Sequence, residues 1–317
     1  MATFVARRLL QSLVVIFGIS AVVFFIMHAV PGGPLSAYRD EPGMTAAKLA
    51  GIARQLGVTG PVWVQYVDWL GNALRGNFGY SYTYGVPAIQ LMWERLPATA
   101  ELMLASFSIA VVVSFVLGVS SAVRHHSWWD YLVTLVAYVG ISMPTFALGL
   151  LALIVFAVDL HWFPSGGIAS TGVPFSLGDR IWHLALPALV LAFYSLAGES
   201  RYVRASTLEV LGSDYIRTAR AKGLSERVVI YRHAARTALL PVVTILVLDL
   251  AYLFGGTLVT EQIFAWPGMG RLFFNAVLQG DYPVMMVILS FLSILVVLSG
   301  VAADILYAVL DPRIRYN

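Results

Sequence analysis

Long runs of apolar residues dominate the chain, and shorter segments between them hold most of the charged and turn-forming residues. A membrane-spanning helix needs about 20 mainly apolar residues to cross a hydrocarbon core about 30 Å thick. Runs near this length lie at about 9–30, 98–123, 131–158, 183–198, 238–259 and 284–310. The pattern predicts an all-α integral membrane protein in which six transmembrane helices form a single domain over residues 1–317. The first run exceeds the roughly 7–15 apolar residues of a secretory signal, which favours a retained helix over a cleaved one.

Two of the predicted helices contain a proline. The third run carries Pro144 and the fourth carries Pro187. Because proline lacks a backbone N–H, each is expected to kink its helix, and the carbonyls it frees can line a pathway. Kinks without any ligand contact fit the same pattern. The fourth run is the shortest, because the charged residues Glu199 and Arg201 follow it directly. We expect these two residues to lie in an aqueous segment.

Composition supports a membrane protein and excludes several chemistries. Hydrophobic residues make up 59% of the chain and charged residues 12%, whereas soluble domains are about 45–50% apolar and about 25% charged. There are no cysteines, which excludes disulfides, thiol catalysis and Cys-ligated metals. The adjacent His125 and His126 lack the spacing of a metal site, and no Gly-x-x-x-x-Gly-Lys-Ser/Thr phosphate loop occurs. We therefore expect no metal, no bound cofactor, no catalytic residue and no nucleic-acid partner.

The basic residues predict the orientation in the lipid bilayer, because Lys and Arg in short loops favour the cytoplasmic side. The segment 199–237 is the richest, with Arg201, Arg204, Arg217, Arg220, Lys222, Arg227, Arg232 and Arg236. Placing it inside also puts both termini, with Arg7, Arg8, Arg313 and Arg315, in the cytoplasm. The short outer loops 159–182 and 260–283 then hold only Arg180 and Arg271 as Lys or Arg. The opposite orientation would expose the basic cluster outside.

The segment 31–97 is predicted to be extracytoplasmic and to contain a short amphipathic helix. Trp63, Tyr66, Trp69 and Leu70 recur at helical spacing. Such a stripe is typical of a helix that lies on the membrane surface. A plain packing face against another helix explains it equally well.

The cytoplasmic segment 199–237 carries a helix–turn–helix pattern. Asp214 is a suitable N-cap for a first helix, and Gly223 suits the left-handed position that ends it. Ser225 can cap a second helix at once, with Glu226 at its positive end. A basic cluster beside a membrane can also set the orientation of the helices or bind anionic lipid headgroups. Neither role requires a glycine-centred break between two helices. We call residues 214–236 the elbow, and we expect it to dock on a soluble partner.

The elbow resembles the cytoplasmic "EAA" loop of ABC-importer permeases, in the form found in the dipeptide and oligopeptide branch. Its sequence from Asp214 is Asp-Tyr-Ile-Arg-Thr-Ala-Arg-Ala-Lys-Gly-Leu. Ala219 and Gly223 match the Ala and Gly of the general pattern, and Arg217 and Thr218 replace its Glu and first Ala. Further stretches similar to the B-type membrane subunit of that branch are Ala6–Leu9, Val30–Pro34, Gly76–Ser81, Glu94–Thr99, Ser142–Phe146, Glu261–Leu272 and Asp311–Arg313. The resemblance therefore covers nearly the whole chain.

This resemblance implies a type I ABC-importer permease fold and a transport subunit that is not itself an enzyme. A homologous second permease would complete the translocation pathway in the bacterial or archaeal plasma membrane. Two cytoplasmic ATPase subunits would carry ATP and Mg, and an extracytoplasmic solute-binding protein would deliver dipeptides or oligopeptides. The exact cargo stays open, with dipeptides, longer peptides, glutathione and nickel chelates all handled by similar chains.

Two groups of residues are expected to meet these partners. The ATPase-coupling group is Asp214, Tyr215, Arg217, Ala219, Arg220, Lys222, Gly223, Leu224 and Ser225. The group expected to dock the binding protein is Glu261, Phe264, Trp266, Pro267, Gly268, Gly270 and Arg271. The second group fits equally well a simple connector with Trp266 as an interfacial anchor.

Asp249, in the middle of the fifth run, is expected to line the translocation pathway together with Pro144 or to have a protein partner. A charge at the bilayer centre costs about 2.5–3.5 kcal/mol on insertion scales. Asp249 could attract the amino end of a peptide, but a hydrogen bond to Tyr252 or a pair with the second permease is favoured.

The alternative function is a self-sufficient, ion-coupled secondary transporter with Asp249 as its ion site. Such a carrier has no need of a cytoplasmic docking elbow, so the sequence favours the ATP-driven importer.

Overall fold

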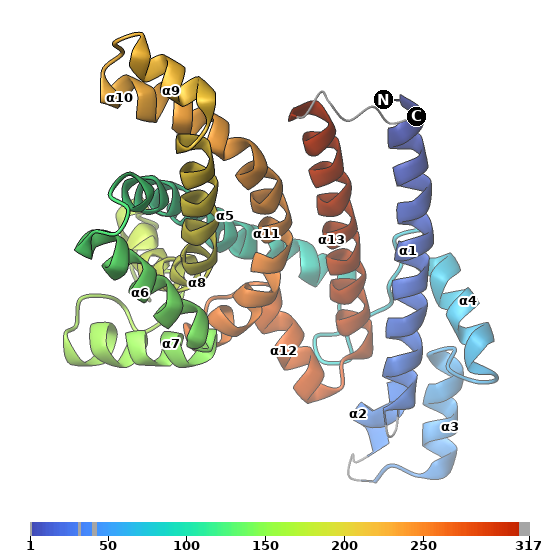
Figure 1. Cartoon of the computed structure of the whole chain (residues 1–317). Coiled ribbons are helices and arrows are strands. Elements are labelled where there is room, and N and C mark those ends of the chain that lie inside the picture. Colours follow the sequence, from blue (N-terminus) through green and yellow to red (C-terminus); the bar gives the residue numbers. More distant parts are fainter. Residues whose placement is uncertain (1, 31–32, 40–42, 311–317) are drawn as a thin grey trace. The chain divides into compact units, whose positions relative to one another are not determined.

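The computed structural model describes residues 2–30, 33–39 and 43–310, and most of this part of the chain is helical. The α-helices are α1 (Ala2–Ala29), α2 (Ser36–Arg39), α3 (Ala46–Gln55), α4 (Val62–Ala73), α5 (Ala88–Val123), α6 (Trp128–Ser142), α7 (Thr145–Ala152), α8 (Leu177–Leu211), α9 (Asp214–Ala221), α10 (Glu226–Val228), α11 (Ala235–Ile263), α12 (Met269–Gln279) and α13 (Tyr282–Leu310) (Figure 1). A 3₁₀ turn covers Gly33–Leu35, and π-helical segments cover Leu153–Asp159 and Val229–Ala234. Among the described residues, β pairing is limited to one bridge between Tyr80 and Pro87. The predicted all-α class is confirmed.

The chain divides into two compact units. The first unit holds residues 1–99 and 267–298, and the second holds 100–266 and 299–317.

Helices of membrane-spanning length and hydropathy occupy the predicted apolar runs. Arg7–Ala29, Ala88–Val123, Leu177–Leu211 and Tyr282–Leu306 are each long and apolar enough to cross a bilayer, and α6 with the helical segment after it adds a fifth span if counted together. The remaining predicted span, the fifth run at 238–259, lies inside the 29-residue helix α11. The described helices are thus compatible with the predicted six.

The third predicted span is broken rather than merely kinked. α6 ends at Ser142, and the helices on either side of Pro144 meet at 105°. Met143 has the extended conformation φ −95°, ψ 125°, because the residue before a proline is driven out of the helical region. Pro144 then serves as the N-cap of α7. Pro187, by contrast, lies inside the unbroken helix α8.

The helix that contains the fourth predicted span extends beyond it at both ends. α8 has 35 residues and continues through Glu199 and Arg201 to Leu211. Most of the predicted cytoplasmic segment 199–237 is therefore helix rather than loop. The helix passes Glu199 because that side chain is buried, with 2% exposed, and bonded to Ser114 of α5.

In the first unit, α4 packs on α1 through the predicted aromatic stripe. The Tyr66 hydroxyl lies 2.9 Å from the Ser20 hydroxyl, and the rings of Tyr66 and Trp69 contact Phe24, with centroids 5.4 and 5.6 Å away. Trp63 points outward, with 65% of its surface exposed. Of the two interpretations left open, the structure supports a packing face for Tyr66 and Trp69.

In the second unit, α8 packs against both α6 and α11. Close approach of α5 to α8 depends on Gly118, because a Cβ there would lie 2.6 Å from the Cβ of Val203. Small residues at such crossings are the usual means of packing helices in lipid, where apolar burial supplies little driving force between them.

Candidate coupling and translocation sites

The elbow has two helical arms, α9 before Gly223 and α10 with the π-helical segment 229–234 after it. The first arm begins one residue earlier than predicted. Ser213, not Asp214, occupies the N-cap position of α9. The Ser213 hydroxyl donates to the carbonyl of Val210 at 2.6 Å and does not cap the helix. Asp214 is the first helical residue, where its carboxylate still faces the positive end of the helix dipole.

Gly223 makes the turn between the two arms in the predicted left-handed conformation, with φ +75°. Its N–H donates to the carbonyl of Arg220 at 2.9 Å. No heavy atom lies within 4 Å of where its Cβ would stand. A larger residue would therefore be opposed by the backbone conformation itself and not by a neighbouring group.

The second arm runs without a break into a transmembrane helix. Ser225 is the N-cap of α10, as predicted, but its hydroxyl makes no capping bond. The amides of Val228 and Val229 donate to the carbonyl of Ser225 at 2.9 and 3.0 Å. The π-helical segment 229–234 then joins α10 to α11. The elbow thus joins α8 to α11.

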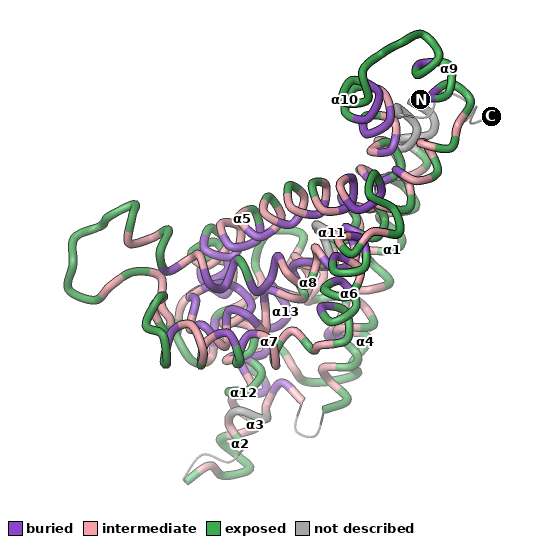
Figure 2. The backbone as a smooth tube through the Cα atoms, turned by 60° about the vertical axis from the view of Figure 1, so that its left-hand side comes forward, coloured by how far each residue is buried: buried purple, intermediate pink, exposed green. Residues whose placement is uncertain are grey.

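One face of the elbow is buried and the other is open to solvent (Figure 2). Ile216 and Ala219 of α9 pack on Val229 and Ala234 of the second arm. Ala219 of the predicted coupling group therefore holds the arms together. The exposed members of the group are Asp214, Tyr215, Arg217, Arg220, Lys222, Gly223, Leu224 and Ser225.

A bidentate ion pair spans the turn. Arg220 Nε lies 3.1 Å from Glu226 Oε1, and Arg220 Nη2 lies 2.7 Å from the same oxygen. The Arg220 guanidinium lowers the pKa of the Glu226 carboxyl below its ordinary value. The sequence placed Glu226 at a helix end but did not predict this partner.

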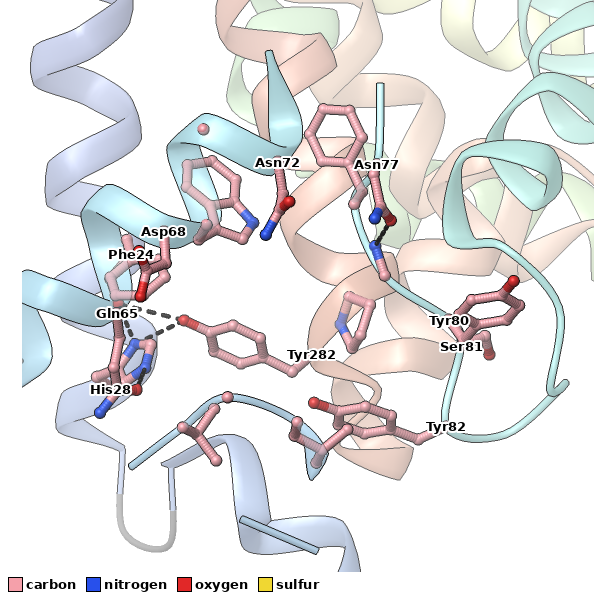
Figure 3. Close-up of a pocket in the computed structure, with 18 of the residues that line it drawn as sticks. Phe24, His28, Gln65, Asp68, Asn72, Asn77, Tyr80, Ser81, Tyr82 and Tyr282 are labelled. Carbon is pink, nitrogen blue, oxygen red and sulfur yellow. Dashed lines mark hydrogen bonds between the residues drawn. The ribbon is translucent and has the colours of Figure 1, made fainter. Parts of the chain in front are cut away.

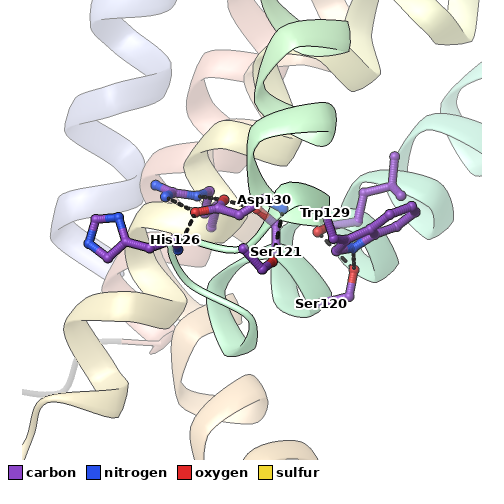
Figure 4. A network of polar contacts seen from close by, with 8 residues as sticks. Ser120, Ser121, His126, Trp129 and Asp130 are labelled. Atoms are coloured by element: carbon purple, nitrogen blue, oxygen red, sulfur yellow. Dashed lines mark hydrogen bonds and ion pairs between the residues drawn. The ribbon is translucent and has the colours of Figure 1, made fainter.

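A buried polar network fixes the helix that leads to the elbow (Figure 4). Arg204 of α8 donates from Nε and Nη2 to the two carboxylate oxygens of Asp130, at 2.6 and 2.8 Å. The Ser121 hydroxyl and the His126 amide also donate to Asp130, at 2.5 and 3.1 Å. Asp130 is only 2% exposed, so α5, the 124–127 turn, α6 and α8 are tied at one point.

The predicted docking segment is largely buried. Phe264 is 1% exposed and packs with Leu186 and Val190. Trp266 is 0% exposed, and the Arg180 guanidinium carbon lies 5.3 Å from its ring centroid. These contacts bury both aromatic side chains within the second unit, and a docking role for them stays a prediction.

The remaining docking residues divide in the same way. Glu261, Gly268 and Gly270 are buried, and only Pro267 and Arg271 are partly exposed. In the first unit, Pro267 and Arg271 line a hollow of about 110 Å³ together with Tyr84 and Arg95.

Asp249 is half-buried on α11 and lies within electrostatic reach of Glu199 on α8. The Ser114 hydroxyl donates to Glu199 Oε2 at 3.0 Å, and Glu199 Oε1 has no partner among the described residues. The proximity of Asp249 and Glu199 was not predicted from the sequence, because Glu199 was assigned to the aqueous segment. The side chain of Tyr252, the predicted partner of Asp249, lies outside the described residues. Pro144 is exposed at the α6–α7 break.

The described residues offer no group of three His, Cys, Asp or Glu side chains that could hold a metal ion.

Comparison with known proteins gives two family matches that together cover most of the chain. Residues 114–316 match the model described as "Binding-protein-dependent transport system inner membrane component". Residues 1–103 match the N-terminal model of the same kind of membrane component.

Individual relatives match along their whole length. An oligopeptide transport system permease protein, AppB, of Bacillus subtilis is 44% identical over 317 residues, with 100% of both chains covered. A putative peptide permease protein of Brucella suis is 41% identical, with 99% of both chains covered. A dipeptide transport system permease protein, DppB, of Alkalihalophilus pseudofirmus is 37% identical, with 100% of both covered.

Proposed function

The chain belongs to the family of binding-protein-dependent transport system inner membrane components, and we propose on this premise that it imports dipeptides or oligopeptides. It is a multi-pass permease subunit of an ABC transport system, as the resemblance implied. The peptide cargo is supported by the names of its relatives, which span its full length.

The observation that carries the proposed mechanism is the elbow, whose two arms join α8 directly to α11. We propose that its exposed face, above all Tyr215, Lys222 and Leu224, sits in a groove of a partner ATPase. ATP and Mg then belong to two ATPase chains. When ATP binding closes the ATPase dimer, the elbow moves inward, and α8 and α11 rock as rigid bodies to change the side on which the pathway opens.

The predicted topology indicates on which side of the membrane each further partner would bind. The Lys and Arg distribution supports a cytoplasmic location for both termini and the elbow. A solute-binding protein then docks outside, where Pro267 and Arg271 are the partly exposed residues of the predicted docking segment. A homologous permease supplies the other half of the pathway, which Asp249 and Pro144 are proposed to line.

Reconstitution tests this function. The chain is purified with its second permease and two ATPases in lipid nanodiscs, and ATP hydrolysis is measured with the binding protein and a panel of di-, tri- and pentapeptides. Stimulation of hydrolysis by peptides, and uptake of the same peptides into proteoliposomes, is the expected result. Gradient-driven uptake by this chain alone would contradict the proposal and would favour an ion-coupled carrier at Asp249.

A further inference from the structure

The first unit contains a cavity of about 800 Å³ that none of the predicted functions uses (Figure 3). It lies between the end of α1, the length of α4, the segment 75–82 and the start of α13. Its volume falls within the range of about 300–1,000 Å³ that is usual for small-molecule sites.

Aromatic side chains form much of the wall. Those that line it are Phe24, Tyr38, Trp69, Phe78, Tyr80, Tyr82 and Tyr282. Hydrogen bonds hold the Tyr282 side chain in place, because its hydroxyl lies 2.6 Å from His28 Nδ1 and His28 Nε2 lies 3.1 Å from Gln65 Oε1. Burial raises the pKa of Tyr82 above its ordinary value, so its hydroxyl stays neutral. The cavity is therefore preformed, with apolar faces and neutral polar groups.

Two full charges of opposite sign also line the cavity, and both are exposed. They are Asp68 on α4 and Arg75 just beyond its end. No ion pair joins either of them to another of the described residues. Arg75 follows Asp68 by seven positions. α4 ends at Ala73, but the amides of Leu74 and Arg75 continue the turn by donating to the carbonyls of Leu70 and Asn72 at 2.9 and 3.0 Å. The backbone rise from Asp68 to Arg75 is therefore about 10 Å.

That spacing matches a short peptide. An extended chain spans at most about 3.3–3.6 Å per residue, so three residues cover about 10 Å between a terminal amine and a terminal carboxylate. Asn72 and Asn77 also line the cavity, on the same side as Asp68 (Figure 3), and their side-chain amides can bond to peptide groups.

We propose that this cavity binds a short peptide with free termini, placing the ammonium group at Asp68, the carboxylate at Arg75 and the side chains against the aromatic wall. An Arg guanidinium binds a carboxylate through two parallel hydrogen bonds, which suits Arg75 to this role. The inference rests on the proposed peptide cargo and goes beyond it, since the permease would itself recognise both ends of the peptide after release from the binding protein.

The test uses the complete permease–ATPase complex in nanodiscs without the binding protein. Calorimetry measures the Kd of trialanine, N-acetyl-trialanine and trialanine amide. With the wild-type chain, each modification is expected to weaken binding by about tenfold, as loss of one charge-assisted hydrogen-bonded contact does. Asp68→Asn should remove the penalty for acetylation alone, and Arg75→Gln the penalty for amidation alone.

Matched controls are Glu94→Gln and Arg54→Gln, which change exposed charges of the same unit that do not line the cavity. Each control variant should still bind N-acetyl-trialanine and trialanine amide about tenfold more weakly than trialanine. Equal affinity of the wild-type chain for all three peptides, or no binding of trialanine at millimolar concentration, would overturn the proposal even if a variant failed to fold.

A separate readout distinguishes this proposal from the proposed function. If peptides stimulate ATP hydrolysis in the presence of the binding protein but the three probes bind alike, the cavity is not a peptide site and the importer function stands. If no peptide stimulates hydrolysis, the peptide cargo itself is wrong.

Discussion

Arg220 and Glu226 face each other across the turn at Gly223, with Arg220 Nη2 2.7 Å from Glu226 Oε1. Arg220 lies near the end of α9 and Glu226 begins α10, so their contact helps to fix the angle between the arms. About half of each side chain is exposed, 46% and 57%, so the pair adds little to global stability. Its consequence is a defined shape for the surface that we propose meets the ATPase.

The elbow requires glycine at position 223. Gly223→Val forces a branched residue into the left-handed region, at a cost of about 1–3 kcal/mol, and should deform the turn. We expect peptide-stimulated ATP hydrolysis and uptake to become uncoupled while membrane insertion persists. Gly198→Val, at a helical glycine with no atom within 4 Å of an added Cβ, is the matched control. Normal uptake in the Gly223 variant would remove the elbow from the mechanism.

Acid should loosen the elbow. Because Arg220 lowers the pKa of Glu226 below its ordinary 4.5, the ion pair stabilises the folded elbow above that pH. Its contribution is lost as the pH falls through the lowered pKa. Hydrogen-exchange protection factors at 223–228 should hold from neutral pH to about pH 5 and fall below about pH 4. Glu226→Gln should abolish that fall, whereas Arg217→Gln should retain it.

The buried pair Asp130–Arg204 should matter far more for stability. Removing one partner of a buried ion pair costs about 3–5 kcal/mol, because the other charge is left uncompensated. We expect Asp130→Asn to lower the thermal unfolding midpoint of the purified chain, and Asp130→Asn with Arg204→Gln to lower it by less than the sum of the single changes. Arg201→Gln, at an exposed arginine of the same helix, should leave the midpoint nearly unchanged.

Two changes separate packing from docking in the 261–271 segment. Phe264→Ala should destabilise the chain by about 3–5 kcal/mol, because it empties a buried site. Arg271→Ala should lower the unfolding midpoint by less than Phe264→Ala does, because Arg271 is partly exposed, and it should weaken binding of the solute-binding protein, measured by surface plasmon resonance on nanodiscs. Wild-type affinity of the Arg271 variant would exclude that side chain from the docking surface.

The proposed pathway role of Asp249 can be tested with cargo charge. Asp249→Asn should slow uptake of cationic peptides relative to neutral ones of the same length, because it removes the negative charge that would attract them. Asn keeps the side-chain shape, so a structural role alone should affect both cargoes equally. Unchanged uptake of both would remove Asp249 from the pathway. Glu199→Gln serves as the comparison, since it neutralises the neighbouring acid and can keep its bond to Ser114.

Local features of the fold were predictable from the sequence. Apolar runs of about 20 residues locate helices because every backbone polar group must be bonded within the bilayer. The left-handed turn at Gly223 and the break at Pro144 follow from the sterics of single residues, although the 105° bend exceeds the predicted kink. The confirmed family resemblance also came from contiguous motifs.

Contacts between distant residues were not predictable. Asp130 and Arg204 are 74 positions apart, and no local pattern marks either as the other's partner. Glu199 was assigned to water because a carboxylate normally ends an apolar run, yet packing against Ser114 buried it. Phe264 and Trp266 were expected at a surface because Pro and Gly follow them, but Phe264 packs on Leu186 and Val190, and Arg180 covers the ring of Trp266.

The sequence by itself therefore determined where the helices lie, where they turn and to which family the chain belongs, because these depend on forces that act over a few neighbouring residues. Only the tertiary structure decided which charges are buried and paired, which side of the elbow faces solvent, and that Asp68, Arg75 and an aromatic wall share one cavity. Those relationships arise when helices pack: α5, α6 and α8 meet around Asp130, the two arms of the elbow pack on each other, and α1, α4 and the start of α13 surround the cavity. Packing depends on the shapes of side chains that are far apart along the chain.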